Sequence, residues 1–281
     1  MSETTRRNPP YFSVLIPVYR MEAPDFLRDS LDSLAKQKLP PTEIVLVKDG
    51  PLTKELDNVI DFFSRDNPNL LKTVSLEKNY GLGVALAKGL VECKNELVAR
   101  MDADDISSPD RFEKQIAYLS DHPEIDVVGS STEEFMNKPG DSSILKLVPE
   151  HPNEIYAAAK MRNPMNHMTV VFRKRRVIEA GNYTPMPYFE DYFLWVRMLL
   201  MGAKFYNIQT PLVMARVGNN MIGKRHGLKY ATHEISYFRK IHQLKFITKI
   251  QFLKAIFLRI PTRFLPKGLL TYVYKVLLRR N

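Results

Sequence analysis

The stretch "ELVARMDADDIS", residues 96–107, decides how this chain is interpreted, because an apolar run ends there in a group of carboxylates. The run closes at Met101, and three of the next four residues are Asp102, Asp104 and Asp105. Like charges held this close repel one another. The group therefore indicates either a bound cation or an acidic turn that caps a helix, and the surrounding fold has to distinguish the two.

The same arrangement of apolar run and helical pattern occurs four times in the first 130 residues. Short apolar runs predict strands, and apolar residues three and four apart predict the helices that follow them. The expected strands are 11–19, 43–50, 72–77 and 96–105, and the expected helices are 25–37, 53–65, 81–93 and 110–121. Four successive strand–helix units predict an α/β fold with a mainly parallel sheet and helices on both faces.

In a sheet of this kind, ligands bind beyond the carboxyl ends of the strands. Tyr19 follows the first expected strand, Asp49 the second and residues 77–79 the third, while the three aspartates follow the fourth. All of these side chains should meet at one edge of the sheet. The acids among them suit a metal ion and a ligand rich in hydroxyl groups.

Asp102 and Asp104 are separated by one residue, so both can reach a single divalent cation. Carboxylate oxygens that leave positions open for water or diphosphate suit Mg²⁺ or Mn²⁺. Asp105 would then bind the cation or orient a ligand. The alternative is a turn without metal, leading into a helix that begins at Asp110 after Pro109.

The C-terminal part differs from the rest in charge. The chain carries +10 overall, but residues 224–281 hold fourteen Lys or Arg and one acid, which leaves the first 223 residues near −3. Phe, Leu, Ile and Tyr alternate with Lys and Arg from Lys245 onward. This composition is typical of an amphipathic helix lying on an anionic membrane, and a helical appendage packed on the main domain is the alternative. We expect no membrane span and no secretory signal, because apolar runs of the required length are missing.

Six blocks in sequence order carry a resemblance to a known family: "FSVLIPVYR", "EIVLVKDGP", "EKNYGLGVALAKGL", "ARMDADDIS", "NPMNHMTVVFRK" and "YFEDYFLWVRML". Together they resemble the family 2 glycosyltransferases, which have the GT-A fold. The subset they resemble comprises bacterial galactosyl- and glucosyltransferases of amylovoran, exopolysaccharide and O-antigen assembly. The resemblance implies a catalytic domain at 1–223, with a nucleotide-sugar half at about 11–130 and an acceptor half at about 131–223. The basic helical extension, 224–281, follows it.

The resemblance also implies roles for individual residues. The nucleotide pocket would be lined by Pro17, Tyr19, Glu22, Asp49, Lys78, Asn79 and Gly83. Asp104 would be the main metal ligand, and Asp102 would touch the metal or the ribose. Asp191 would be the general base, with Glu190 as its competitor.

The chemistry of an inverting sugar transfer agrees with these roles. One carboxylate has to take the proton from the attacking acceptor hydroxyl. Positive charge is needed at the departing diphosphate, and a metal ion supplies it. For Glu190 and Asp191 the alternative is helix capping, because both open a helical segment.

Two strands are expected near residues 204–208 and 212–216, and a basic loop follows them. Arg216, at the end of the second strand, and Arg225 and His226 of the loop could clamp the diphosphate, and the glycines of this loop would let it close. The alternative is a solvated basic loop.

Three further residues are candidates for the acceptor site. Asn166 and His167 precede an expected strand, where His167 could bind acceptor or phosphate. A lone histidine beside an apolar strand is more often structural. Trp195 has helical spacing with Tyr192 and Met198, so it is expected in the core first and on a sugar ring second.

We therefore predict an inverting, metal-dependent glycosyltransferase that uses Mn²⁺ or Mg²⁺. Its donor would be a UDP-sugar carrying galactose or glucose, and its acceptor a saccharide linked to undecaprenyl diphosphate, in O-antigen or exopolysaccharide synthesis. It would be cytoplasmic and peripheral on the inner membrane face, with no nucleic-acid partner, and no oligomeric state is predicted. One alternative is a nucleotidyltransferase, although "PVYRMEAPD" lacks the expected glycine- and lysine-rich loop. A non-catalytic protein that binds membrane or nucleic acid is the other.

Overall fold

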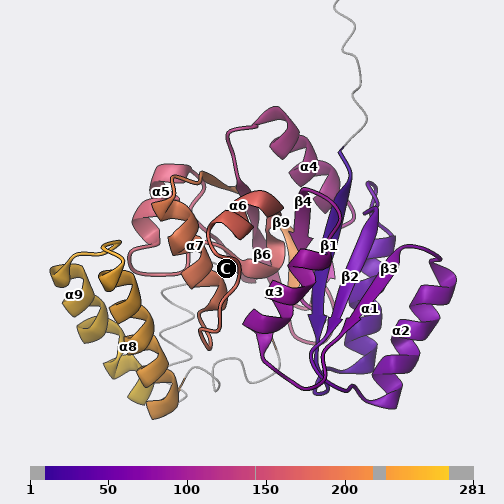
Figure 1. The fold of residues 1–281 in the computed structure, drawn as a ribbon, viewed down its shortest axis with the longest axis horizontal. Helices are drawn as coiled ribbons and strands as arrows, with labels where there is room; N and C mark the ends of the chain where they lie inside the picture. The colour runs from indigo at the N-terminus through magenta and orange to yellow at the C-terminus, as the bar shows by residue number, and fades with distance from the viewer. Residues whose placement is uncertain (1–9, 143, 218–225, 266–281) are drawn as a thin grey trace, which may run out of the picture.

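A computed structural model describes residues 10–142, 144–217 and 226–265 of the chain (Figure 1). The strands are β1 Phe12–Val18, β2 Glu43–Lys48, β3 Leu71–Ser75, β4 Leu97–Arg100, β5 Ile106–Ser107, β6 Val127–Phe135, β7 Ile144–Lys146, β8 Val171–Arg173 and β9 Phe205–Arg216. The helices are α1 Pro24–Ala35, α2 Lys54–Asp66, α3 Leu82–Glu92, α4 Arg111–Asp121, α5 Pro152–Ala158, α6 Lys174–Glu179, α7 Glu190–Leu200, α8 Gly227–Gln243 and α9 Lys249–Arg259. Two short 3₁₀ helices are η1 His167–Thr169 and η3 Pro261–Phe264.

The first half of the chain forms the parallel part of the sheet. Strand β1 pairs in parallel with β2 and β4, and β2 pairs in parallel with β3. Side chains alternate between the two faces: Leu15 and Val45 pack with α3, whereas Val14 and Ile44 pack with α1 and α2. Both faces are buried, as the nearly continuous apolar runs require. The predicted strand–helix order is confirmed here.

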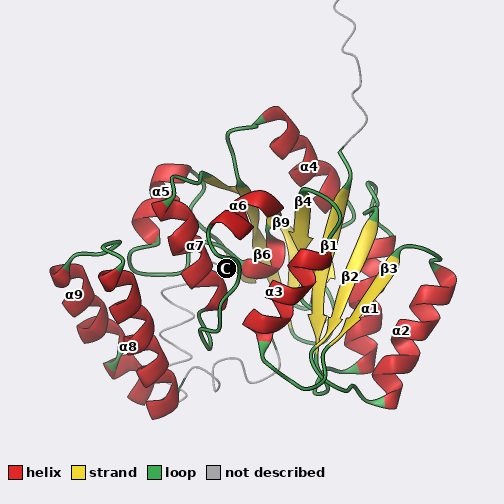
Figure 2. Ribbon diagram, in the orientation of Figure 1, coloured by secondary structure: helices red, strands yellow, loops and turns green. Residues whose placement is uncertain are grey.

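The second half adds strands of mixed direction. The full order is β3-β2-β1-β4-β8-β6-β9-β5, and β7 pairs with β6. The arrows of β1, β2 and β3 point the same way in Figure 2. Strand β8 runs antiparallel to both β4 and β6, while β9 runs parallel to β6. The sheet therefore combines a parallel part with a part of mixed strand direction.

One expectation about strands is corrected. We expected two strands near residues 204–208 and 212–216, but β9 is a single strand across both. Its pairing with β6 shifts register between Ser130 and Thr132, so Pro211 falls where the ladder is interrupted. A proline is tolerated at such an irregularity because its missing N–H is not needed there.

A two-residue strand fixes the aspartate turn. Strand β5 pairs antiparallel with β9, with Ile106 opposite Met214 and Ser107 opposite Val213. The turn that contains Asp102, Asp104 and Asp105 is thus held between β4 and β5. Its position is therefore set by two strands of one sheet, β4 in the middle of the strand order and β5 at its end.

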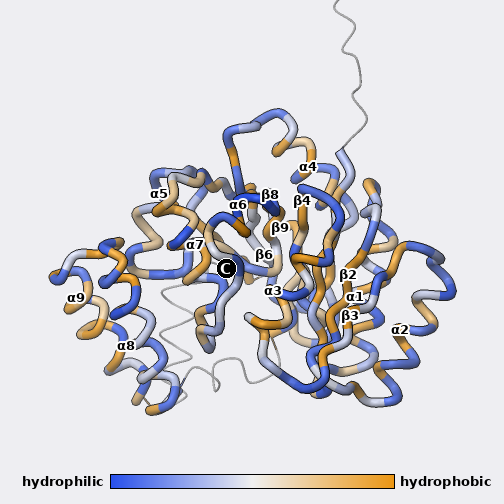
Figure 3. Tube along the Cα trace, viewed as in Figure 1, coloured by the Kyte–Doolittle hydropathy of each residue, from blue (hydrophilic) through white to orange (hydrophobic). Residues whose placement is uncertain are grey.

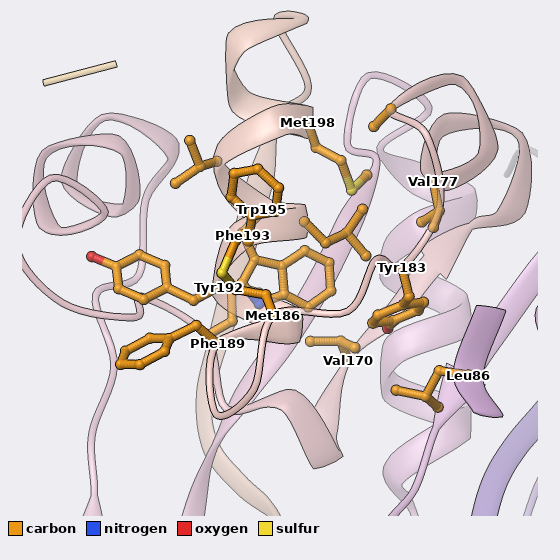
Figure 4. Packing of buried hydrophobic residues seen from close by; sticks show 14 of the residues in the cluster. Leu86, Val170, Val177, Tyr183, Met186, Phe189, Tyr192, Phe193, Trp195 and Met198 are labelled. Carbon is orange, nitrogen blue, oxygen red and sulfur yellow. The ribbon is translucent and has the colours of Figure 1, made fainter. Parts of the chain in front are cut away.

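The apolar helix α7 fills the second core. Trp195 is 0% exposed and lies among Phe193, Met186 and Val170 (Figure 4). Burial of large aromatic side chains of this kind dominates core stability. Helix α7 is therefore packed into the core along most of its length, which holds its first residues in a defined place.

Helices α8 and α9 lie side by side at the end of the molecule away from β3 (Figure 1). Glu234 of α8 has no exposed side-chain surface, and it pairs with Arg259 and Arg263 at 2.7 Å each. Arg259 also donates to the Met161 carbonyl at 3.1 Å, which ties α9 to the catalytic part. Helix α9 mixes apolar and polar positions (Figure 3). In the described part of the chain, no helix combines the length and apolarity needed to cross a bilayer.

Candidate active site

The three aspartates after β4 form one cluster. A carboxylate oxygen from each of Asp102, Asp104 and Asp105 lies within 4.8 Å of the others. Asp102 forms an ion pair with Arg100, and the Asp105 Oδ1 atom accepts from the Arg216 backbone N–H at 2.9 Å. The other oxygen of Asp105 is buried without a hydrogen-bond partner. The turn is therefore anchored at its two ends, whereas its carboxylates remain crowded.

The electrostatics of this cluster fit a cation. Burial, followed by the charges of Asp102 and Glu22, raises the pKa of Asp104 to about 7. Burial, followed by the charges of Asp102 and Asp104, holds the pKa of Asp105 well above its usual range. Converging oxygen ligands of this kind suit Mg²⁺ or Mn²⁺. A divalent ion would give the second oxygen of Asp105 a partner and would offset the repulsion among the three carboxylates.

Arg216 supports this turn from the inside. Its Nε donates to the Asp104 carbonyl at 3.1 Å, and its Nη2 pairs with Asp29 at 3.3 Å. The guanidinium lies between the rings of Phe26 and Phe135, at 3.8 and 4.5 Å from their centroids. These partners engage the Arg216 guanidinium within the fold, and its contact with a diphosphate stays a prediction.

The ends of β1 and β2 lie near the aspartates, as expected. Burial, followed by the charges of Glu22 and Asp104, raises the pKa of Tyr19, so these groups lie near one another. Asp49 is buried, and its two oxygens accept from the backbone N–H groups of Tyr80 and Gly81 at 2.8 and 3.0 Å. Asp49 therefore positions the loop after β3, and its contact with a nucleoside stays a prediction.

The loops after β2 and β3 touch at Gly50. This residue has φ +89°, and a Cβ atom there would lie 2.6 Å from the Asn79 backbone nitrogen. Only glycine allows both the conformation and the approach. Lys78 and Asn79 themselves are exposed, and the Lys78 ammonium lies 5.3 Å from the Tyr80 ring centroid. Pro17 is half-buried near the end of β1. The six expected nucleotide residues at the ends of β1, β2 and β3 lie at one edge of the sheet: Pro17, Tyr19, Glu22, Asp49, Lys78 and Asn79.

A second pair of carboxylates opens α7. The Asp191 carboxylate accepts from Asn163 Nδ2 at 2.6 Å, and burial raises its pKa. Burial is the largest cause that raises the pKa of Glu190 to about 7, and the Asp191 charge adds to it. A hydrogen bond with the backbone N–H of Glu190 itself acts in the opposite direction. A Cβ atom on Gly83 would lie 3.0 Å from Glu190 Cγ, so α3 and α7 meet closely here. Gly83 thus serves this contact between helices.

The aspartate cluster after β4 and the carboxylates that open α7 both lie near one buried guanidinium group, that of Arg100. Arg100 is 1% exposed, and its charge acts to lower the pKa of both Asp104 and Asp191. Its Nε and Nη1 atoms are buried without hydrogen-bond partners. Sequence reasoning missed Arg100 and Asn163, because an arginine in a strand and an asparagine in a loop carry no pattern of their own.

Two expected acceptor contacts are corrected. Trp195 has no exposed surface for a sugar ring, and Asn166 is 1% exposed, with its amide donating to the Ser130 carbonyl at 3.0 Å. His167 Nε2 lies 2.9 Å from the Tyr183 hydroxyl, and burial holds the pKa of His167 well below its usual range. Trp195 lies in the core, which is the first of the two places predicted for it.

The expected basic clamp falls partly outside the described residues. Arg225 lies in the segment 218–225, which the structure does not describe. His226 precedes α8, and its Nε2 atom lies 2.9 Å from the Leu265 carbonyl oxygen. That contact links the start of α8 to the end of η3. The role of both residues at a diphosphate stays a prediction.

Comparison with known proteins identifies the family to which this arrangement belongs. The profile described as "Glycosyl transferase family 2" matches residues 13–181, which include the aspartate cluster. The chain is a member of glycosyl transferase family 2. It is 42% identical over 264 residues to the "Amylovoran biosynthesis glycosyltransferase AmsE" of Erwinia amylovora, covering 94% of this chain and 98% of the relative. It is 38% identical over 271 residues to an Escherichia coli protein, with 96% and 98% covered. That relative is named "UDP-Gal:alpha-D-GlcNAc-diphosphoundecaprenol beta-1,3-galactosyltransferase".

Solved structures support the fold of this glycosyltransferase. The Pyrobaculum calidifontis mannosyltransferase PcManGT, in complex with GDP-Man and Mn²⁺, aligns with a TM-score of 0.67 at 16% identity, covering 96% of this chain and 76% of that one. TarS 1–349 of S. aureus, in complex with UDP-GlcNAc, gives 0.67 at 19% identity, with 90% and 72% covered. The predicted α/β fold of the GT-A type is confirmed.

Proposed function

We propose that this family 2 glycosyltransferase transfers a hexose from a UDP-sugar to a saccharide linked to a lipid diphosphate, with inversion at the anomeric carbon. The hexose is galactose or glucose, and galactose is the first candidate. The observation that carries the proposal is the aspartate cluster after β4, at the edge of the sheet where the ends of β1, β2 and β3 also lie. The E. coli relative named for UDP-Gal and a diphosphoundecaprenol acceptor supports the choice of substrates. The pathway would be O-antigen or exopolysaccharide assembly.

The chain would hold a divalent ion, Mn²⁺ or Mg²⁺, through Asp104 and Asp102. When bound, such an ion supplies positive charge for the departing diphosphate. Asp105 keeps the turn in place through the Arg216 backbone, at 2.9 Å. Tyr19, Glu22 and the loop at Asn79 would surround the nucleotide.

Asp191 would take the proton from the acceptor hydroxyl. Asn163 donates to its carboxylate at 2.6 Å and so sets the orientation in which the base would meet an attacking hydroxyl. Burial raises the pKa of Asp191, which makes it a stronger base than an exposed aspartate. Glu190, its neighbour, is the competitor for this role.

The substitution Asp191→Asn tests the assignment of the base. The amide keeps an acceptor for Asn163, so folding and UDP affinity should remain close to those of the native chain. Transfer should fall by about 10²–10⁴-fold, the range of general-base contributions. The measurement pairs turnover with UDP binding by calorimetry, and Glu190→Gln is the matched control. If UDP binding fell together with transfer, Asp191 would belong to the donor site.

The basic extension would contact an anionic membrane on its cytoplasmic face, where a lipid-linked acceptor is presented. Helix α9 leaves Ile250, Leu253 and Phe257 exposed, at 79%, 55% and 79%. At the spacing of an α-helix these three lie within about 60° of one another, with Lys254 beside them. Vesicle sedimentation should show binding to phosphatidylglycerol but not to phosphatidylcholine, and the Phe257→Ser variant should bind more weakly. Equal binding to both lipids would contradict the proposal that anionic lipid attracts the basic extension.

A further inference from the structure

Tyr188 combines an unfavourable backbone with an exposed ring beside the carboxylates of α7. Its φ is +71°, a left-handed conformation that bulky residues rarely adopt. It stands two residues before Glu190, and its backbone N–H forms a hydrogen bond that acts to lower the pKa of the Glu190 carboxyl. Strained residues of this kind persist where the surrounding structure holds them for a ligand site.

The ring of Tyr188 is held by aromatic side chains of α8. Its centroid lies 5.0 Å from that of Tyr230, with the planes at 57°, and 5.6 Å from that of His233, at 61°. The residue nevertheless remains 44% exposed. A ring supported at its edges, with exposed surface left over, presents a preformed apolar plane at low entropic cost.

The position of this ring distinguishes it from the other exposed aromatics at the site. Tyr19 directly follows β1 and lies near Asp104, and the Tyr80 backbone N–H donates to Asp49, so both belong to the proposed nucleotide edge of the sheet. Glu190 contacts α3 through Gly83, whereas Tyr188 contacts α8. The Tyr188 ring therefore lies on the side of the carboxylate pair toward α8, away from the nucleotide edge.

We propose that Tyr188 is the platform on which the acceptor sugar rests, and that it determines how tightly the acceptor binds. Sugar rings carry an apolar face of C–H groups, which an aromatic plane covers well. The backbone of the same residue holds Glu190, so acceptor and carboxylates are positioned by one turn. This inference rests on the proposed function, because it assumes an acceptor saccharide beside Asp191.

Three substitutions of Tyr188 separate the ring from the backbone. Tyr188→Phe keeps the plane. Tyr188→Ala and Tyr188→Gly both remove it, but only glycine is relaxed at positive φ. The assay uses the full chain, UDP-Gal and an α-GlcNAc diphosphate that carries a short alkyl group. It records the KM for this acceptor, the KM for UDP-Gal, UDP-Gal hydrolysis without acceptor, and the midpoint of thermal unfolding.

We expect the Phe variant to keep the native acceptor KM and the Ala and Gly variants to raise it about tenfold, as loss of one aromatic contact implies. The KM for UDP-Gal and the rate of hydrolysis should change less than twofold. The Gly variant should unfold at a higher temperature than the Ala variant, which shows that a lost contact, and not a lost fold, raises the acceptor KM.

Two results would overturn the inference while leaving the proposed function intact. One is an unchanged acceptor KM in both Ala and Gly variants. The other is a rise in the KM for UDP-Gal in place of that for the acceptor. If the native chain hydrolysed UDP-Gal but did not use the GlcNAc diphosphate, the proposed acceptor would fall, and the platform for that sugar with it.

Discussion

At the scale of single residues, the site is governed by carboxylates that are buried close to one another. Glu190 is the clearest case for a test, because it lies outside the proposed metal ligands. Burial and the Asp191 charge raise its pKa to about 7, from an ordinary value near 4.5. Its proton is therefore held more tightly in the folded chain than in the unfolded one.

The sign of the pH dependence follows from linkage. The pKa of Glu190 is higher in the folded chain than in the unfolded one. The full free energy of unfolding is therefore present below about pH 4.5, and part of it is lost as the pH rises to about 7 and the buried carboxyl ionises. Glu190→Gln should remove this loss, so its free energy of unfolding at pH 8 should exceed that of the native chain by about 1–3 kcal/mol. Urea unfolding at pH 4.5 and 8 with chelator present measures the difference. A gap of the same size at both pH values would contradict the assignment.

Residue identity could be predicted from the sequence only where a motif carried it. The aspartates after β4 and the carboxylates that open α7 lie where the motifs indicated. Trp195 lies in a predicted helix and Arg216 at the end of a predicted strand, but neither position says which way a side chain points. Both are engaged inside the fold. Arg100 escaped prediction because its burial depends on Asp102 and on neighbours far away in the sequence.

At the scale of elements, the loops that leave β2 and β3 must approach each other closely. Gly50→Ala adds a Cβ atom 2.6 Å from the Asn79 nitrogen at φ +89°. We expect it to cost about 2–4 kcal/mol, from the backbone and the overlap together, and to raise the KM for the donor. Gly81→Ala is the matched control: it has the same φ, but nothing lies within 4 Å of the added atom. It should cost about 1–2 kcal/mol.

Denaturant unfolding and donor kinetics compare these two variants. If Gly50→Ala were no worse than Gly81→Ala, the close contact between the loops would not matter to the site. Elements with a strong period, such as β1 and α2, could be predicted from sequence. Strand β5 could not, because two residues show no period, and β9 was divided at Pro211 because a proline usually ends a strand.

At the scale of the whole molecule, a buried cluster of charged side chains holds the helices of the extension together and attaches them to the catalytic part. Glu234 faces Arg259 and Arg263 at 2.7 Å each, and Arg259 reaches the Met161 carbonyl. Glu234→Gln leaves buried guanidinium charge without its carboxylate, so it should destabilise the chain by about 3–5 kcal/mol. Adding Arg263→Met should recover part of this loss. Chemical denaturation of the full chain measures both, and a change below about 0.5 kcal/mol would contradict the role of the pair.

The overall architecture was predictable because four strand–helix units allow few other arrangements. The mixed direction of β8, β6 and β9 was not, since strand direction depends on long-range pairing. The basic composition of the extension predicted helices with a charged surface. It did not reveal that their one acid, Glu234, is buried as the partner of two arginines.

The central claim is that the aspartates after β4 hold a divalent ion for a UDP-hexose. The most direct measurement is turnover of a set of nucleotide sugars by the full chain, with Mn²⁺ and with chelator, in parallel with the Asp104→Asn variant. We predict that UDP-galactose or UDP-glucose is consumed, only with the cation, and that the variant loses at least about 10²-fold of this rate. Equal turnover in chelator, or native rates in the Asp104→Asn variant, would contradict the account.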